Sequence, residues 1–332
     1  MVKDRISWLD YGKCICMLMV ILLHTSAYYT GGSNLFLDLL LPTRLVVFFF
    51  ISGYLTKIET FNFRKTITSI AKKLLFPYFL FTSIIYLPKH LASGAEFTFA
   101  TMLYDILGGF ASWFVTALAV SKISLAVLLK YCKNIVVIGV VCSLLVIIGF
   151  LMTQYIEGPI AWYAQYGLIS LVYLFPGMVY KKYESKLNKY IGWQAIISVI
   201  LYFTCVVIDH FYLGASTYIY TLEAGGVTFS GVMSYLFLSF LGIWMMVSLV
   251  KLIPAGVKWM TYIGKNSLTY YYLNTGLLVV LIAIMNRIGL GYNGNDYLIL
   301  PLFIIVVVIL TIISQLIIRF APWMVGNFGK KN

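Results

Sequence analysis

The chain has 332 residues, of which 61% are hydrophobic and 11% are charged, and its mean hydropathy is +0.93. This composition leaves too little polar surface for a water-soluble globule, so it excludes soluble folds and indicates an integral membrane protein. The formal net charge is +13, but the sequence contains no nucleic-acid-binding motif and no phosphate-binding glycine loop. We therefore expect no nucleic acid partner and no ATP-driven transport.

Apolar stretches recur along the chain at about 20 residues, the length that a transmembrane helix needs. The short alternating strands of an outer-membrane barrel are not found. We expect an all-α integral membrane protein with about ten spans, built as a single domain over residues 1–332. The spans are predicted at residues 11–30, 35–56, 74–91, 110–129, 135–153, 162–180, 191–212, 230–250, 267–287 and 297–319, and no span is expected to be broken.

The first span carries Lys13 and His24 around the apolar run CICMLMVILLH. Eleven residues turn a helix by about 1100°, which is about 20° more than three turns, so both side chains lie on one face about 16.5 Å apart. An ionisable side chain inside a bilayer is costly and is by default functional. The alternative is a neutral histidine that hydrogen-bonds a neighbouring hydroxyl. We favour the functional interpretation.

The second span carries another charge, Arg44, thirteen residues before Lys57 at the cytoplasmic end. Arg44 therefore lies about 19.5 Å along that helix, at a depth similar to that of His24. The first two spans are joined by a short turn around GGSN, so we expect antiparallel neighbours. His24 and Arg44 are then expected to face a common polar cavity. Ser52 and Gly53 are interpreted as packing residues, because small side chains let membrane helices approach closely.

An amphipathic segment at about residues 61–73 precedes the third span. Its apolar residues recur at helical spacing, so we predict an interfacial helix. Four basic residues follow its polar face: Arg64, Lys65, Lys72 and Lys73. Such a charge run either holds phosphate groups or anchors the chain to anionic lipid.

Basic residues set the predicted orientation, because cytoplasmic loops retain Lys and Arg. With the N-terminus inside, all 24 Lys and Arg residues fall in cytoplasmic segments except Lys89 and Arg287, in outer loops, and Arg44, within a span. This pattern favours both termini in the cytoplasm and a multi-pass protein of the plasma (inner) membrane, with membrane lipid as a partner.

The remaining polar residues give weaker signals. The three histidines, His24, His90 and His210, lie far apart in the sequence, and no C-x-x-C pair occurs, so we expect no metal. His90 and His210 are placed at outer helix ends. Trp113 is interpreted as part of the aromatic belt at the outer face.

Six blocks, in order, resemble the membrane acyltransferase-3 family. They are RISWLDYGKCICMLMVILLH at 5–24, RLVVFFFISGYL at 44–55, KKLLFPY at 72–78, SWF at 112–114, FPGMVYKK at 175–182 and IGKNSLTYYYLN at 263–274. The chain departs from the family pattern at Asn274, where many relatives carry histidine, and at Arg44, where some do. An arginine pair known from some branches at the third span is also absent.

The resemblance implies transfer of an acyl group, usually acetyl from cytoplasmic acetyl-CoA, to a hydroxyl of a glycan or glycolipid sugar. His24 is then the general base, and Arg44 stabilises the oxyanion or orients the acyl carbonyl. Donor binding falls to the basic residues Lys13, Arg64, Lys72 and Lys73, with Asp10 as a possible partner of Lys13. Direct transfer and an acyl-enzyme relay both stay open.

Two other functions compete with acyl transfer. A transporter or exporter of a polysaccharide or glycolipid precursor would also need many spans, usually with inverted repeats and broken helices around a midplane site. A non-catalytic scaffold would tolerate the loss of His24. At the outer face, Asp209, His210 and Glu223 either contact an acceptor or are solvated loop residues, and loop solvation is the expected outcome.

Overall fold

The computed structural model describes residues 6–32, 35–93, 97–213 and 228–329. These residues form helices joined by turns, with no β-strand among them, which confirms the all-α prediction. Eight helices or helical runs in this part of the chain are long and apolar enough to cross a membrane: Ser7–Thr30, Phe63–Pro88, Trp113–Tyr131, Ile135–Tyr155, Leu171–Leu213, Phe229–Leu252, Ser267–Arg287 and Asp296–Phe320. The number of spans and the side of the termini stay predictions.

The helices nearest to the sites described below are α1 (Ser7–Thr30), α3 (Leu41–Arg44), α4 (Val46–Tyr54), α5 (Phe63–Ile70), the π-helical turn η1 (Ala71–Leu75), α6 (Phe76–Ser93), α7 (Phe99–Leu107), α8 (Trp113–Tyr131), α14 (Lys258–Lys265), α15 (Ser267–Arg287), α16 (Ile299–Phe320) and the 3₁₀ turn η7 (Pro322–Val325). The others are α2 (Leu35–Asp38), α9 (Ile135–Tyr155), η2 (Ala161–Tyr163), α10 (Ala164–Ile169), α11 (Leu171–Leu187), η3 (Asn188–Tyr190), α12 (Ile191–Ile208), η4 (Asp209–Leu213), α13 (Phe229–Leu252) and η6 (Asp296–Leu298).

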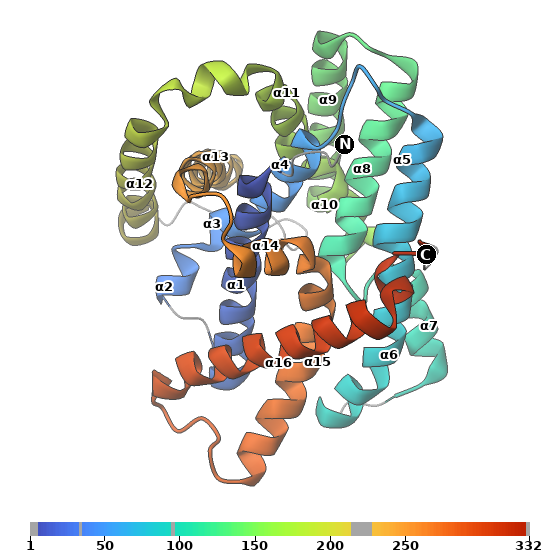
Figure 1. The fold of residues 1–332 in the computed structure, drawn as a ribbon, viewed down its shortest axis with the longest axis vertical. Coiled ribbons are helices and arrows are strands. Elements are labelled where there is room, and N and C mark those ends of the chain that lie inside the picture. The colour runs from blue at the N-terminus through green and yellow to red at the C-terminus, as the bar shows by residue number, and fades with distance from the viewer. Residues whose placement is uncertain (1–5, 33–34, 94–96, 214–227, 330–332) are drawn as a thin grey trace.

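Helix α1 lies in the interior of the bundle, with α12 on one side and α6 and α7 on the other (Figure 1). It packs against α13, α14, α15 and α16. Its buried face includes Tyr11, Cys14, Met17 and Ile21. The first predicted span is therefore central to the fold, and the polar residues it carries face other helices as well as lipid.

The second predicted span is interrupted at Leu45, which differs from the expectation of continuous spans, although Leu45 keeps a helical φ of −101° and ψ of −29° and residues Pro42–Tyr54 form one shorter apolar helix. Helix α3 ends at Arg44, and α4 starts two residues later, after Leu45. Bonds of the i to i+3 type, from Thr43 N to Leu40 O and from Phe48 N to Leu45 O, replace the regular ladder there. Pro42 lies in the first turn of α3, where its missing N–H is tolerated, so it does not account for the interruption at Leu45. Irregular backbone is tolerated at membrane depth only where protein or a cavity covers it.

The third span starts earlier than predicted. Asn62 caps the helix by accepting a hydrogen bond from Lys65 N at 2.9 Å, and α5, η1 and α6 then run on without interruption to Ser93. The π-helical turn precedes Pro77, which has no N–H to donate to Lys73, and such turns arise where the regular ladder is interrupted. The amphipathic segment is thus the first part of a long helix, and its interfacial position stays a prediction.

Three glycines let two pairs of helices touch through their backbones. A Cβ at Gly53 would lie 1.8 Å from Leu174 O, and one at Gly177 would lie 2.1 Å from Phe50 O, so α4 and α11 cross in direct contact. The packing role predicted for Gly53 is confirmed. Similarly, a Cβ at Gly264 would lie 1.9 Å from Asp10 O, which brings α14 onto α1 beside Lys13.

Candidate active site

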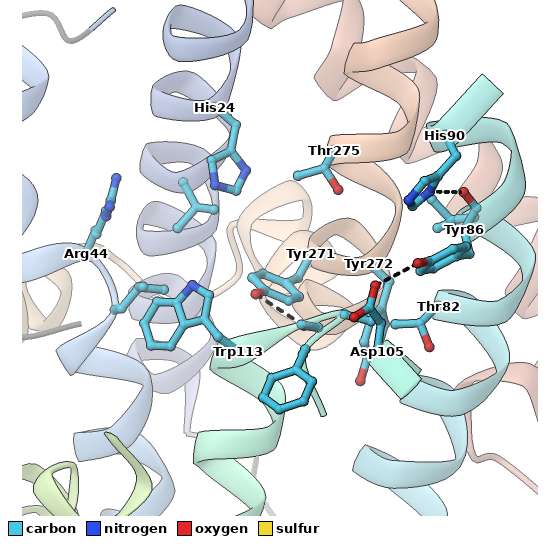
Figure 2. Close-up of a pocket in the computed structure, with 16 residues that line it drawn as sticks. His24, Arg44, Thr82, Tyr86, His90, Asp105, Trp113, Tyr271, Tyr272 and Thr275 are labelled. Atoms are coloured by element: carbon cyan, nitrogen blue, oxygen red, sulfur yellow. Dashed lines mark hydrogen bonds between the residues drawn. The ribbon is translucent and has the colours of Figure 1, made fainter. Parts of the chain in front are cut away.

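His24 and Arg44 line the same cavity, as expected from their depths. This cavity, the His24 chamber, has a volume of about 390 Å³, within the range of about 300–1,000 Å³ that is typical of small-molecule sites. Its walls come from α1, α3, α6, α7, α15 and the start of α8 (Figure 2): Val20, His24, Arg44, Leu45, Thr82, Ile85, Tyr86, His90, Asp105, Phe110, Ala111, Ser112, Trp113, Tyr271, Tyr272 and Thr275.

The proton on the His24 ring is assigned by Asn274. Nδ1 of His24 lies 2.6 Å from Oδ1 of Asn274. The Asn274 amide nitrogen donates to Tyr271 O at 2.5 Å and to Tyr270 O at 3.3 Å, which fixes the amide with its oxygen toward the histidine. Since that oxygen only accepts, Nδ1 carries the proton, and in a neutral ring Nε2 would be the nitrogen that accepts. A general base requires this neutral state.

Arg44 lies at the C-terminal end of α3, where the second span breaks. Only 9% of the residue is exposed. The break places a guanidinium at the edge of the His24 chamber, and Figure 2 shows His24 and Arg44 at one end of it.

The opposite end of the chamber holds polar residues whose importance sequence reasoning missed. Tyr86 and His90 come from α6 and Asp105 from the short helix α7. The sequence placed His90 at an outer helix end and singled out no role for Asp105. Neither residue interrupts a long apolar span, so their sequence context gave no signal for a site.

A second cavity, the lysine vestibule, has a volume of about 630 Å³. Four lysines line it: Lys13 from α1, Lys73 from η1, Lys122 from α8 and Lys265 from α14. The sequence predicted all four in cytoplasmic segments, and that orientation stays a prediction. The predicted pairing of Asp10 with Lys13 is confirmed by a contact of 3.0 Å.

The vestibule includes only two of the four residues predicted to bind the donor. Lys13 and Lys73 line it, whereas Arg64 and Lys72 do not. Arg64 is exposed on α5, and the Lys72 ammonium lies 5.9 Å from the centroid of the Phe328 ring. Lys122 and Lys265 were not singled out from the sequence. Lys265, at the end of α14, looks the same whether it anchors lipid or lines a cavity. Lys122 lies in the middle of α8, and its position inside a span was a signal that sequence reasoning missed.

The two cavities adjoin at a set of aromatic rings. Tyr272 lines both cavities. Its ring stacks on the Phe81 ring with the centroids 5.4 Å apart. The Tyr271 and Phe114 rings are also in contact, with their centroids 5.2 Å apart. The vestibule and the His24 chamber are therefore neighbours along α1, with Lys13 at one and His24 at the other.

The outer residues considered as acceptor contacts lie elsewhere. Asp209 is 3% exposed and accepts a hydrogen bond from Ser234 at 2.5 Å, so the expectation of a solvated loop residue was wrong for this side chain. It lines neither cavity. Glu223 lies outside the described residues.

Comparison with known families decides the class of the protein. The family model described as an acyltransferase domain, that of the acyltransferase-3 family, matches residues 6–319. The chain belongs to the acyltransferase-3 family. The matched region contains every residue that lines the His24 chamber. Comparisons with curated proteins and with solved structures gave no match.

Membership of the acyltransferase-3 family supports an enzyme that transfers acyl groups, and the eight long apolar helices indicate a multi-pass membrane protein. Within the described residues, no group of three or more His, Cys, Asp and Glu side chains is placed to hold a metal ion. A metal-free reaction stays a prediction.

Proposed function

We propose that this acyltransferase moves an acetyl group from cytoplasmic acetyl-CoA to a hydroxyl of a sugar in a cell-surface polysaccharide or lipid-linked glycan at the plasma membrane. The observation that carries the proposal is the pair of adjoining cavities. One is lined by four lysines, and the other contains His24, whose Nδ1 is held by Oδ1 of Asn274.

The lysine vestibule suits the nucleotide end of coenzyme A. That end carries several phosphate groups, and lysine ammonium groups bind phosphate as point charges. Lys13 and His24 are separated by about 16.5 Å along α1, a distance comparable to an extended pantetheine arm. With its phosphates among Lys13, Lys73, Lys122 and Lys265, the donor would extend past Tyr272 and present its thioester in the His24 chamber.

The proposed reaction at His24 converts the thioester of acetyl-CoA into an ester of the sugar. The sugar oxygen attacks the thioester carbonyl carbon while its proton passes to Nε2 of His24. The carbon–sulfur bond then breaks, and the proton returns from Nε2 to the sulfur. The products are an ester and the free thiol of coenzyme A, and His24 is again neutral.

The proposed role of Arg44, which lines the same chamber, concerns the negative charge that develops during this exchange. The carbonyl oxygen becomes negative as the hydroxyl attacks, and a nearby cation stabilises it most strongly where water is excluded. A guanidinium stays charged throughout. We propose that Arg44 stabilises this oxyanion or holds the acyl carbonyl in position.

Export of a glycan or glycolipid precursor is the second candidate. One observation favours it, since the break after Arg44 resembles the discontinuous helices of transporters. Transport, however, leaves the two ordered cavities and the Asn274 contact without a role, and the acyltransferase family match stands against it.

Mass spectrometry of surface and lipid-linked glycans, from cells with and without the protein, separates these functions. Acyl transfer predicts that sugars lose the mass of one acetyl group per modified site when the protein is absent. Unchanged glycan masses together with altered export would contradict acyl transfer and support the transporter.

Removal of one vestibule lysine should weaken donor binding selectively. For Lys122→Ala, we expect the KM for acetyl-CoA to rise about tenfold, because one charge-assisted contact to phosphate is lost. The kcat should change less than about twofold, since Lys122 lies outside the His24 chamber. Steady-state kinetics of the purified enzyme in lipid nanodiscs give both constants.

Lys186→Ala is the matched control, because Lys186 is exposed and lines neither cavity. It should leave the KM for acetyl-CoA unchanged. Equal KM values in the Lys122 variant and the wild type would remove Lys122 from the donor site.

A further inference from the structure

The geometry points to a subsite for a neutral sugar ring at the end of the His24 chamber opposite Arg44, formed by Asp105, Tyr86 and His90. The inference rests on the proposed function, because it assumes that His24 deprotonates a sugar hydroxyl. It adds which residues hold the acceptor and which class of sugar they accept.

Asp105 is held in place as a hydrogen-bond acceptor. The Tyr86 hydroxyl donates to Oδ2 of Asp105 at 2.6 Å, and Tyr86 is itself buried, with 7% of its surface exposed. Within the described residues, Asp105 forms no salt bridge. An ionised carboxylate accepts about four hydrogen bonds, so the Tyr86 contact leaves capacity for ligand hydroxyl groups. Asp105 lines the chamber and is available to them.

His90 lines the chamber beside Tyr86. Its Nδ1 lies 2.9 Å from the Tyr86 carbonyl oxygen, which accepts and cannot donate, so Nδ1 carries the proton. The ring stacks on Tyr86 with centroids 4.1 Å apart, which fixes its plane.

Thr82 completes the pattern. Its hydroxyl donates to Tyr78 O at 2.6 Å, so the oxygen offers lone pairs to the chamber. The hydroxyl protons of Tyr86 and Thr82 are thus engaged within the protein, and this end of the chamber presents the acceptor oxygens of Asp105 and Thr82. Such a surface suits a ligand that donates several O–H groups, and it repels phosphate or carboxylate groups.

The wall between the two ends is aromatic. Figure 2 shows Tyr271 between His24 and Asp105, and Trp113 also lines the chamber. Aromatic rings present broad apolar faces, on which the C–H face of a sugar ring can pack. A sugar that rests on this wall with one hydroxyl group on Asp105 would direct a hydroxyl group on its other side toward His24.

The test uses purified enzyme in lipid nanodiscs, acetyl-CoA, and octyl glycosides of neutral hexoses, N-acetylhexosamines and uronic acids as acceptor probes. We expect transfer to neutral glycosides and much less to uronides. Asp105→Asn should raise the KM for the best neutral glycoside at least about tenfold and leave the KM for acetyl-CoA unchanged. It should also raise the relative rate with the matching uronide, because the repelling charge is gone.

Asp296→Asn is the matched control, because Asp296 is exposed, lines neither cavity and also accepts a hydrogen bond from a tyrosine, Tyr292, at 3.3 Å. If Asp105→Asn does not fold, Tyr86→Phe should also raise the KM for the neutral glycoside, by a smaller factor. The subsite would be overturned, and the proposed function would stand, if the folded variants kept two wild-type properties. These are the KM for the neutral glycoside and the preference for neutral glycosides over uronides. Failure of the wild type to acetylate any glycoside would instead overturn the proposed function and the subsite together.

Discussion

Replacement of His24 by alanine should reduce kcat for acetyl transfer by about 10²–10⁴-fold, the range that a general base contributes. The KM for acetyl-CoA should change little, because the phosphates are bound in the lysine vestibule. Side-chain removal leaves a partly exposed position on α1, so insertion and thermal stability in detergent should be nearly preserved. Release of coenzyme A thiol in the presence of a glycoside acceptor measures the rate.

His210→Ala is the control for this substitution, since His210 is exposed and lies outside both cavities. It should keep wild-type kcat. A His24→Ala enzyme that transfers acetyl within about threefold of the wild-type rate would refute the assignment of the base.

Replacement of Arg44 by glutamine should lower kcat by about 10²–10³-fold, the loss typical when a group that stabilises an oxyanion is removed. Arg44→Lys should recover part of the rate, because it restores the charge without the planar fork of donors. The comparison of kcat and KM in both variants separates transition-state stabilisation from ground-state binding.

A purely structural role for Arg44 predicts a different result. The residue is buried at the break between α3 and α4, so a structural arginine would show its loss in the thermal stability of the protein. A folded Arg44→Gln variant with normal kcat would contradict the catalytic role.

The fold was predictable where the controlling physics is local. Hydrophobic length identified the long helices, and helical periodicity placed Lys13 and His24 on one face of α1. Small-residue packing identified Gly53 as a contact point between helices. These inferences need only the sequence around each residue.

The site was less predictable, because its partners are distant in the chain. Asn274 is 250 residues from His24, and at the sequence level it stood out only as a departure from the family pattern. Lys265 resembles a lipid anchor until the tertiary fold brings it to one cavity with Lys13, Lys73 and Lys122. His90 and Asp105 become site residues through the packing of α7 against α6. The close packing of α13 on α3, where a Cβ at Gly242 would lie 2.2 Å from Thr43 Oγ1, is likewise a contact between distant parts of the chain.

The central claim is that the donor lies along α1, with its phosphates in the lysine vestibule and its acyl group in the His24 chamber. Photo-cross-linking with an acyl-CoA that carries a diazirine in the acyl group, followed by peptide mass spectrometry, tests it most directly. We expect labelled residues in the chamber wall on α1, α6 and α15, with labelling suppressed by excess coenzyme A and weakened in Lys122→Ala. Labels confined to residues outside both cavities, such as the exposed face of α9 or α12, would contradict it.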